Sequence, residues 1–228
     1  MTANTANTAN TAGTASTSST AKTAGTARTV HPIEAESYRI LRTHLDTSTL
    51  PPHTKAVVER VIHASADFDY ATDLVTDEAA LAKAAAALRT GAPIVADVEM
   101  VAAGITRRDA LCAIKDPAAP KLAAELGITR SAAALRIAAE QAGPGAVYVI
   151  GCAPTALFEL IAIAEEARPA LVIGLPVGFV GAAESKAVLR ESGLPAVSNV
   201  TGKGGSAVAA AALNALIYED LVKEGNAS

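Results

Sequence analysis

The sequence predicts a single α/β domain with a mostly parallel sheet flanked by helices on both faces. From Pro93 onward, short apolar runs alternate with helical patterns of about ten to fifteen residues, as in βαβ units. Half of the residues are hydrophobic, alanine is abundant and aromatic residues make up only 3%, which suits thin helices packed closely on a flat sheet. The 228 residues are enough to bury one sizeable core.

The chain before Pro93 is predicted to be helical. Pro32 suits the first turn of a helix over residues 33–45. A second helix begins at about Pro51 and is closed by the stretch 59–69; its apolar residues recur at helical spacing. A third helix, capped by residues 76–78, runs through Leu88 and ends at Gly91.

Five strands and five helices are predicted after that point. The strands are 93–97, 111–114, 146–150, 171–175 and 196–199, and the helices are 117–126, 131–141, 154–167, 182–192 and 205–219. In open parallel sheets, ligands bind beyond the carboxyl ends of the strands. The loops that follow the predicted strands are therefore the expected site.

These loops are rich in backbone donors. Asp97 and Glu99 follow the first strand and could act as an acid and base pair, although turns and helix caps use the same arrangement. Arg130 begins a helix, where it could bind a carboxylate or phosphate or form a surface ion pair. Glycine-rich loops follow at 174–186 and 201–206, and neither matches a nucleotide-binding fingerprint. The pattern favours a pocket for a large organic ligand with several negative charges.

His63 is the candidate acid. It lies in the last predicted turn of the second helix, where unpaired carbonyls favour a cation and help an imidazole to hold its proton. Most histidines at helix ends are caps or solvated groups, so the geometry alone leaves both interpretations open.

Residues 1–30 form a Thr/Ala-rich extension with nothing large to bury, which we expect to be disordered, and residues 31–228 form the domain. Without the two basic residues of the extension, the domain has 17 basic and 23 acidic residues, and this net charge of −6 argues against nucleic acid as a partner. No apolar run reaches the roughly 18 residues needed to span a membrane, and no signal peptide is recognisable. Cys112 and Cys152 lack a metal-type spacing and fit a reducing cytoplasm.

From about Pro32 to Tyr218 the chain resembles the precorrin-8X methylmutase family, which includes the cobalt-precorrin-8 methylmutases. The resemblance is carried by long segments in family order and spacing: 37–41, 60–64, 91–104, 129–134, 153–158, 174–186 and 204–207. It implies an α/β homodimer that uses no metal or organic cofactor and acts in cobalamin biosynthesis. It also implies that a methyl group moves from C-11 to C-12 of a corrinoid by a formal 1,5-sigmatropic shift.

The resemblance further implies roles for particular residues. His63 matches the catalytic histidine, which is thought to protonate a ring nitrogen, and Ser37 and Arg130 match the active-site serine and arginine. The acidic side chains of such a substrate would account for Arg130, Lys186, Lys203 and the amide-rich loops. The remaining expected binding residues are Asp97, Thr155, Gly178, Lys186, Gly205 and Ser206. Where the family usually has asparagine this chain has Cys152, a weaker donor, and the basic stretch near Lys203 is reduced.

Three alternatives remain open at this point. The substrate is either metal-free precorrin-8X, which gives hydrogenobyrinic acid, or the cobalt-containing counterpart, which gives cobyrinic acid. A corrinoid-binding carrier without catalysis would need the same loops. A nucleotide-using enzyme built on the glycine-rich loops is the third, and it lacks a specific motif.

Overall fold

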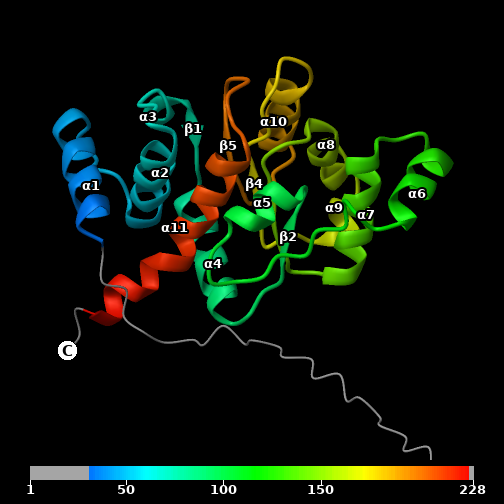
Figure 1. Ribbon diagram of the computed structural model, residues 1–228, viewed down its shortest axis with the longest axis horizontal. Helices are drawn as coiled ribbons and strands as arrows, with labels where there is room; N and C mark the ends of the chain where they lie inside the picture. Colours follow the sequence, from blue (N-terminus) through cyan, green and yellow to red (C-terminus); the bar gives the residue numbers. More distant parts are fainter. Residues whose placement is uncertain (1–30, 226–228) are drawn as a thin grey trace, which may run out of the picture.

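The computed structural model describes residues 31–225, with side chains described as far as Tyr218, and the expected disordered extension 1–30 lies outside them. The described chain is an α/β protein in which helices cover both faces of one five-stranded sheet (Figure 1). This confirms the predicted fold class and its mostly parallel sheet.

The strand order is β1-β5-β4-β3-β2. The pairs β2–β3, β3–β4 and β4–β5 are parallel, and β1 runs antiparallel to β5. Tyr148 lies between Val95 and Val172 in the register. The strands are β1 (Leu74–Val75), β2 (Ile94–Ala96), β3 (Val147–Ile150), β4 (Leu171–Gly174) and β5 (Ala196–Asn199).

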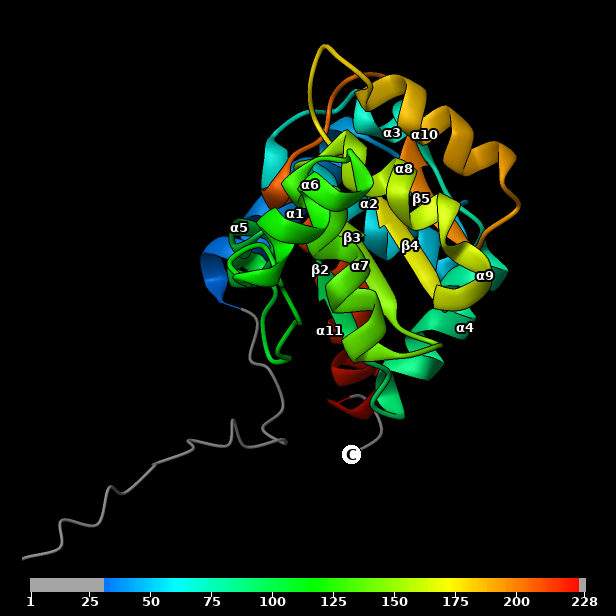
Figure 2. The same cartoon turned by 90° about the vertical axis from the view of Figure 1, so that its right-hand side faces the viewer.

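Alternation along these strands divides the core in two, because successive side chains point to opposite faces. Val147, Val149 and Ile173 pack with α2 (Pro52–Ser65), α4 (Glu78–Arg89) and α11 (Ser206–Gly225). Tyr148, Ile150 and Val172 pack with α7 (Arg130–Ala142), α8 (Pro154–Ala162) and α10 (Ala182–Glu191). Figure 2 shows α7 and α8 in front of the sheet, with α11 behind it.

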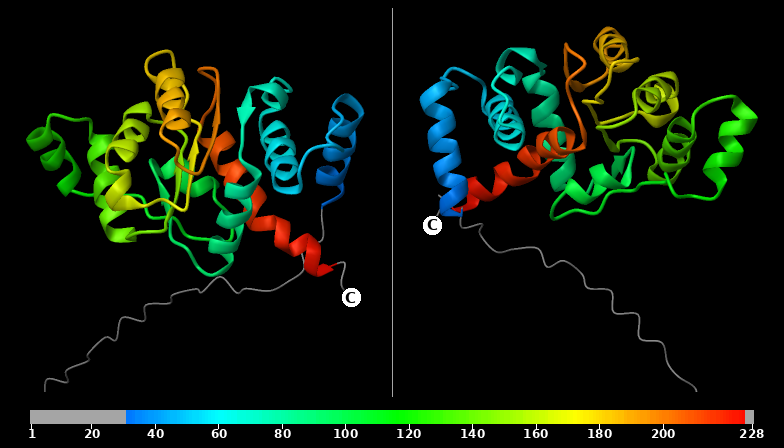
Figure 3. Two further views of the ribbon diagram at one scale, coloured as in Figure 1. Left: turned by 180° about the vertical axis from the view of Figure 1, so that it is seen from behind. Right: turned by 45° about the horizontal axis from the view of Figure 1, so that its top comes forward.

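The order of the helices explains where the loops gather. The connections from β2 to β5 place α7, α8 and α10 on one face, since each strand pairs with the next in sequence. The chain then crosses to the other face, where α11 runs diagonally beside α2 (Figure 3). The connections after β4 and β5 consequently project together at the upper edge in Figure 1. That edge is the carboxyl end of the parallel strands, as the sequence predicted.

The N-terminal helices add to the helix layer that contains α2, α4 and α11. The outermost of them is α1 (Pro32–His44), which packs on α2 (Figure 3). A short helix, α3 (Tyr70–Asp73), then leads into β1. Neither α3 nor β1 was predicted, because four-residue and two-residue elements are too short to show a period. Within the described part of the chain, no helix is long and apolar enough to cross a membrane.

Two predicted elements are wrong and one is divided. Residues 111–114 do not form a strand: Leu111 makes one isolated parallel bridge to Val95, and a turn follows before Pro117. The segment after Asp97, expected as a loop, contains α5 (Glu99–Gly104). The helix predicted over 154–167 ends at Ala162 and resumes as α9 (Ala164–Ala167). The helix predicted over 117–126 is found as α6 (Ala118–Leu126).

Candidate functional site

The imidazole of His63 is held in place by α1. His63 lies in the last turn of α2, as predicted, and its side chain is half-buried. The Ser37 hydroxyl lies 2.8 Å from Nδ1 of His63 and forms a hydrogen bond with it. An open hollow of about 480 Å³ runs along α1 and includes Ser37. The expected acid, His63, and the expected binding residue Ser37 therefore lie together beside an accessible surface.

Tyr38 fixes the plane of the same imidazole. The two rings are stacked, with centroids 5.0 Å apart and an interplanar angle of 10°. The Tyr38 hydroxyl accepts a hydrogen bond from Arg60 at 3.3 Å, and Arg60 pairs with Glu34 at 2.5 Å. These contacts join α1 to α2 next to His63. A hydrogen bond at Nδ1 and a ring on one face leave the imidazole little rotational freedom.

A second pair of contacts reinforces this junction. Arg42 donates two hydrogen bonds to the carboxylate of Glu59, at 3.0 and 2.7 Å, and Thr47 donates one at 2.5 Å. Burial opposes the charge of Glu59, but these hydrogen bonds outweigh it and lower the pKa of the carboxyl. Glu59 is thus a buried anion with three donors and serves to dock α1 on α2.

Asp97 is buried and stabilises the local structure. Its carboxylate is only 2% exposed and accepts hydrogen bonds from the backbone N–H groups of Gly151, Cys152 and Ala153, at 3.2, 2.9 and 2.8 Å. Burial raises the pKa of Asp97 even though these donors favour the anion. The expected role of Asp97 as a direct substrate ligand does not fit this burial. It shapes the loop after β3 instead.

The loop after β3 is joined to the start of α7. The hydroxyl groups of Thr129 and Thr155 lie 2.8 Å apart and form a hydrogen bond. Thr129 also caps α7 by accepting a hydrogen bond from Ala132. Arg130, the first residue of α7, is exposed. Thr155 and Arg130 therefore lie in one region of the surface, although Arg130 follows α6 and not a strand.

The loops after β4 and β5 are bonded to each other at two points. Gly178 donates its N–H to the carbonyl of Gly202 at 3.1 Å, and Gly205 donates to Leu175 at 2.9 Å. A Cβ atom at Gly204, where φ is +151°, would lie 2.3 Å from the Leu175 carbonyl oxygen, so this approach requires glycine. Ser206 begins α11 directly beyond this contact.

Lys186 is inside the protein, and its expected contact with substrate is corrected accordingly. Its side chain has no exposed surface, and Nζ donates to the carbonyls of Pro176 at 3.1 Å and Lys203 at 2.6 Å. A third bond goes to Oδ1 of Asn199 at 2.7 Å. Burial lowers the pKa of Lys186 to about 8, opposed by the nearby charge of Asp73.

A buried network extends from this lysine to β1. Asn199 donates to Asp73 at 2.7 Å, and Asp73 accepts further hydrogen bonds from Val200 and Thr201. Lys203 forms ion pairs with Asp67 at 2.8 Å and with Asp69 at 2.5 Å. Asp67 lies four residues after His63, just beyond the end of α2. The glycine loops are thus tethered to the segment that follows the candidate acid.

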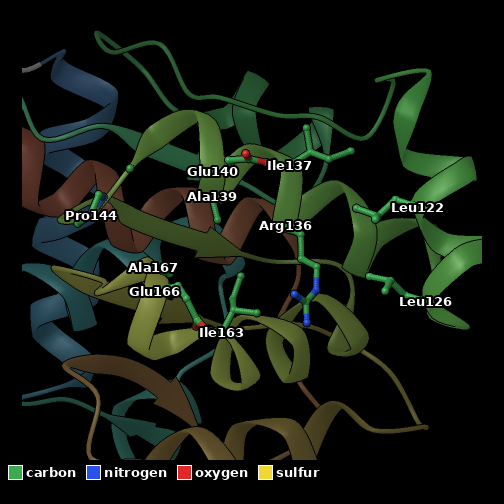
Figure 4. Close-up of a pocket in the computed structure, with 11 residues that line it drawn as sticks. Leu122, Leu126, Arg136, Ile137, Ala139, Glu140, Pro144, Ile163, Glu166 and Ala167 are labelled. Atoms are coloured by element: carbon green, nitrogen blue, oxygen red, sulfur yellow. The ribbon is translucent and has the colours of Figure 1, made fainter.

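A second hollow lies elsewhere. It measures about 490 Å³ and is enclosed by α6, α7 and α9, with Leu122 and Leu126 facing Ile163 and Arg136 (Figure 4). None of the predicted site residues lines it. Among the described residues, no group of three histidine, cysteine, aspartate or glutamate side chains is placed to hold a metal ion.

Sequence reasoning missed three contributors to this arrangement. Tyr38 lies in the family segment 37–41 and was given no role, although its place beside Ser37 was a usable signal. Asp73 and Asn199 could not be paired from sequence, because they are 126 positions apart and meet only where β1 joins β5.

The structure shows an α/β protein with a histidine at the end of α2 and glycine-rich loops at the carboxyl edge of its sheet. The comparisons with known proteins specify the family. The family model described as precorrin-8X methylmutase matches residues 32–219, so the chain belongs to the precorrin-8X methylmutase family, whose members are isomerases that move a methyl group within one molecule.

Relatives of two names are similar to this chain. It is 43% identical to the precorrin-8X methylmutase of Sinorhizobium sp., over 81% of this chain and 92% of the relative. It is 42% identical to the cobalt-precorrin-8 methylmutase of Methanocaldococcus jannaschii, over 71% and 77%. The solved structure of the precorrin-8X methylmutase of Thermus thermophilus has a TM-score of 0.74 and 35% identity, covering 86% of this chain and 99% of that one.

Proposed function

We propose that this protein converts precorrin-8X to hydrogenobyrinic acid by moving a methyl group from C-11 to C-12, with His63 as the acid. The observation that carries the proposal is the position of His63: the imidazole is bonded to Ser37 and stacked on Tyr38, within segments that match the family. The reaction is an isomerisation, so it consumes no second substrate.

The proton that His63 donates returns to His63 at the end of the reaction. Ser37 engages Nδ1 of His63, so we assign proton transfer to Nε2. Nε2 gives its proton to a ring nitrogen of the macrocycle, which draws electron density from the migrating centre. The methyl group leaves C-11 and bonds to C-12, and the proton then returns to Nε2. General acid catalysis of this kind contributes roughly 10²- to 10⁴-fold.

The loops supply orientation rather than chemistry. Arg130 is exposed, and Thr155 next to it carries a hydroxyl group. The N–H groups of Gly178 and Gly205 bond to Gly202 and Leu175, so these glycines would contribute close approach of the backbone rather than hydrogen bonds. We propose that Arg130, Thr155, Gly178, Gly205 and Ser206 bind the acidic side chains of the corrinoid. Holding a bulky substrate in one conformation removes much of the entropic barrier to the shift.

The cobalt-containing counterpart of precorrin-8X is the second candidate substrate. The relative from Methanocaldococcus jannaschii, which is named for that substrate, favours it at nearly the same identity as the metal-free relative. Incubating the protein with each precursor separately and following the absorbance of the macrocycle distinguishes the two. The preferred substrate is the one with the larger kcat/KM.

The same assay separates an enzyme from a carrier. A methylmutase converts an excess of precursor to product, which mass spectrometry and NMR identify by an unchanged mass and a moved methyl group. Stoichiometric binding with no new methyl position would overturn the catalytic proposal in favour of a corrinoid carrier.

We also propose a cytoplasmic homodimer. The cytoplasmic location is supported by Cys112 and Cys152, which are both free thiols. The dimer is an expectation from the family resemblance. Light scattering coupled to size-exclusion chromatography tests it, and a mass near the 22.9 kDa of one chain would contradict it.

A further inference from the structure

We propose that the backbone N–H groups of Val177 and Gly204 form a binding site for one carboxylate of the substrate, with Lys186 polarising both from behind. This inference rests on the proposed function, because it assigns part of the corrinoid site. Lys186 is too deeply buried to contact the substrate directly, and this inference gives it an indirect role.

The first argument is which peptide units Lys186 touches. Its ammonium donates to the carbonyls of Pro176 and Lys203. Each carbonyl belongs to the same peptide unit as the N–H of the next residue, which is Val177 in one loop and Gly204 in the other. A cation at a carbonyl oxygen polarises the amide and strengthens its N–H as a donor. Lys186 therefore acts on two donors through one charge.

The second argument is direction. None of the peptide bonds described is cis, and in a trans peptide the C=O and N–H point in opposite directions. Both carbonyls point at an ammonium group with no exposed surface, so both N–H groups point away from that buried centre. Val177 is 47% exposed and Gly204 is partly exposed. Within the described residues, neither N–H donates a hydrogen bond to the protein.

The third argument is that the two loops lie against each other. The bonds from Gly178 to Gly202 and from Gly205 to Leu175 join the two segments on either side of these peptides. A Cβ atom at Gly204 would lie 2.6 Å from the Pro176 carbonyl oxygen. Segments this close present their outward N–H groups over a short span. Two adjacent backbone donors suit the two oxygens of a carboxylate.

Two cations and a helix end close to these two N–H groups favour an anion there. Lys186 sits behind the pair, Arg190 on α10 donates to the carbonyl of Asn199 at 2.8 Å, and α11 begins at Ser206, so its positive end lies next to Gly204. Lys203 is paired with Asp67 and Asp69. Asp73 also faces this network and stays charged, since its hydrogen-bond partners Asn199 and Thr201 are neutral donors. The ligand class is a carboxylate on a large organic molecule.

The test compares acids with amides on wild type and Lys186→Met. The probes are the product corrinoid and its mono-amides, each with one carboxylate replaced by a carboxamide. We expect one mono-amide to bind wild type about tenfold more weakly than the acid, and that difference to fall to about twofold in Lys186→Met. Lys121→Met, on the exposed surface of α6, is the matched control and should retain the full difference.

A second measurement needs no variant. Lys186 loses its proton near pH 8, so the preference of wild type for the acid over that mono-amide should decline between pH 7 and 9.5. If every mono-amide is affected equally by Lys186→Met, or if the preference is the same at both pH values, the carboxylate site is refuted. Turnover of precorrin-8X tests the proposed function separately: absent turnover with Lys186-dependent binding would refute the methylmutase and support the anion site.

Discussion

Replacing Ser37 with alanine should slow the reaction without weakening substrate binding. The substitution removes the hydroxyl that lies 2.8 Å from Nδ1 of His63. A hydrogen bond to a charged group is worth about 1.5–3 kcal/mol, and the half-buried setting favours the lower end. About 1.4 kcal/mol corresponds to a tenfold change in rate. We therefore expect kcat to fall about tenfold while KM stays within about twofold.

The assay is steady-state absorbance of the corrinoid, supported by a single turnover with enzyme in excess. Thr43→Ala is the matched control, since it removes a hydroxyl from the same helix that bonds only to the carbonyl of Ile40 in its own turn. An unchanged kcat in Ser37→Ala, or a rise in KM with constant kcat, would show that Ser37 does not act through His63.

Three further predictions concern the groups around this pair. Tyr38→Leu should lower kcat about three- to tenfold at constant KM while Tyr38→Phe retains activity, because the stacked ring matters more than its hydroxyl; equal losses in both variants would contradict this. Asp97→Ala leaves three N–H groups without their acceptor and should lower the free energy of unfolding by about 3 kcal/mol, measured by urea denaturation; a loss under about 0.5 kcal/mol would refute the structural role. The folded pKa of Lys186, about 8, lies below the unfolded value, so the unfolded chain binds more protons above pH 8 and stability should rise with pH there. Urea midpoints from pH 7 to 9.5 should show this rise in wild type and lack it in Lys186→Met; parallel profiles would contradict it.

The helix-and-strand rhythm was readable from sequence because burial leaves a strong pattern. The strands at 146–150 and 171–175 are apolar throughout, since both of their faces are covered by helices. Residues 111–114 carry a similar apolar pattern but lie outside β2 at the edge of the sheet, where a single bridge is formed. An apolar composition indicates that a segment is buried. It does not indicate whether a neighbouring strand is available for hydrogen bonding.

For the site as well, some features could be predicted from the sequence and others could not. His63 was predicted as the acid from its helix end and from the family segments, and the structure places Ser37 beside it. The direction of a side chain is not written in its motif. Lys186 stands in a glycine-rich loop-to-helix segment that suggested a contact with substrate, yet α10 turns it inward to bind two carbonyls and an amide. That orientation depends on how α10 packs against the loops after β4 and β5.

The most direct test of the account is a single turnover of precorrin-8X on His63→Ala. The proposal predicts that the variant binds the corrinoid with a Kd within a few-fold of wild type, because the acid side chains are held by the loops. It also predicts a loss of methyl migration by roughly 10²-fold or more. Methyl migration at the wild-type rate in a folded, substrate-saturated His63→Ala variant would contradict the assignment of His63 as the acid.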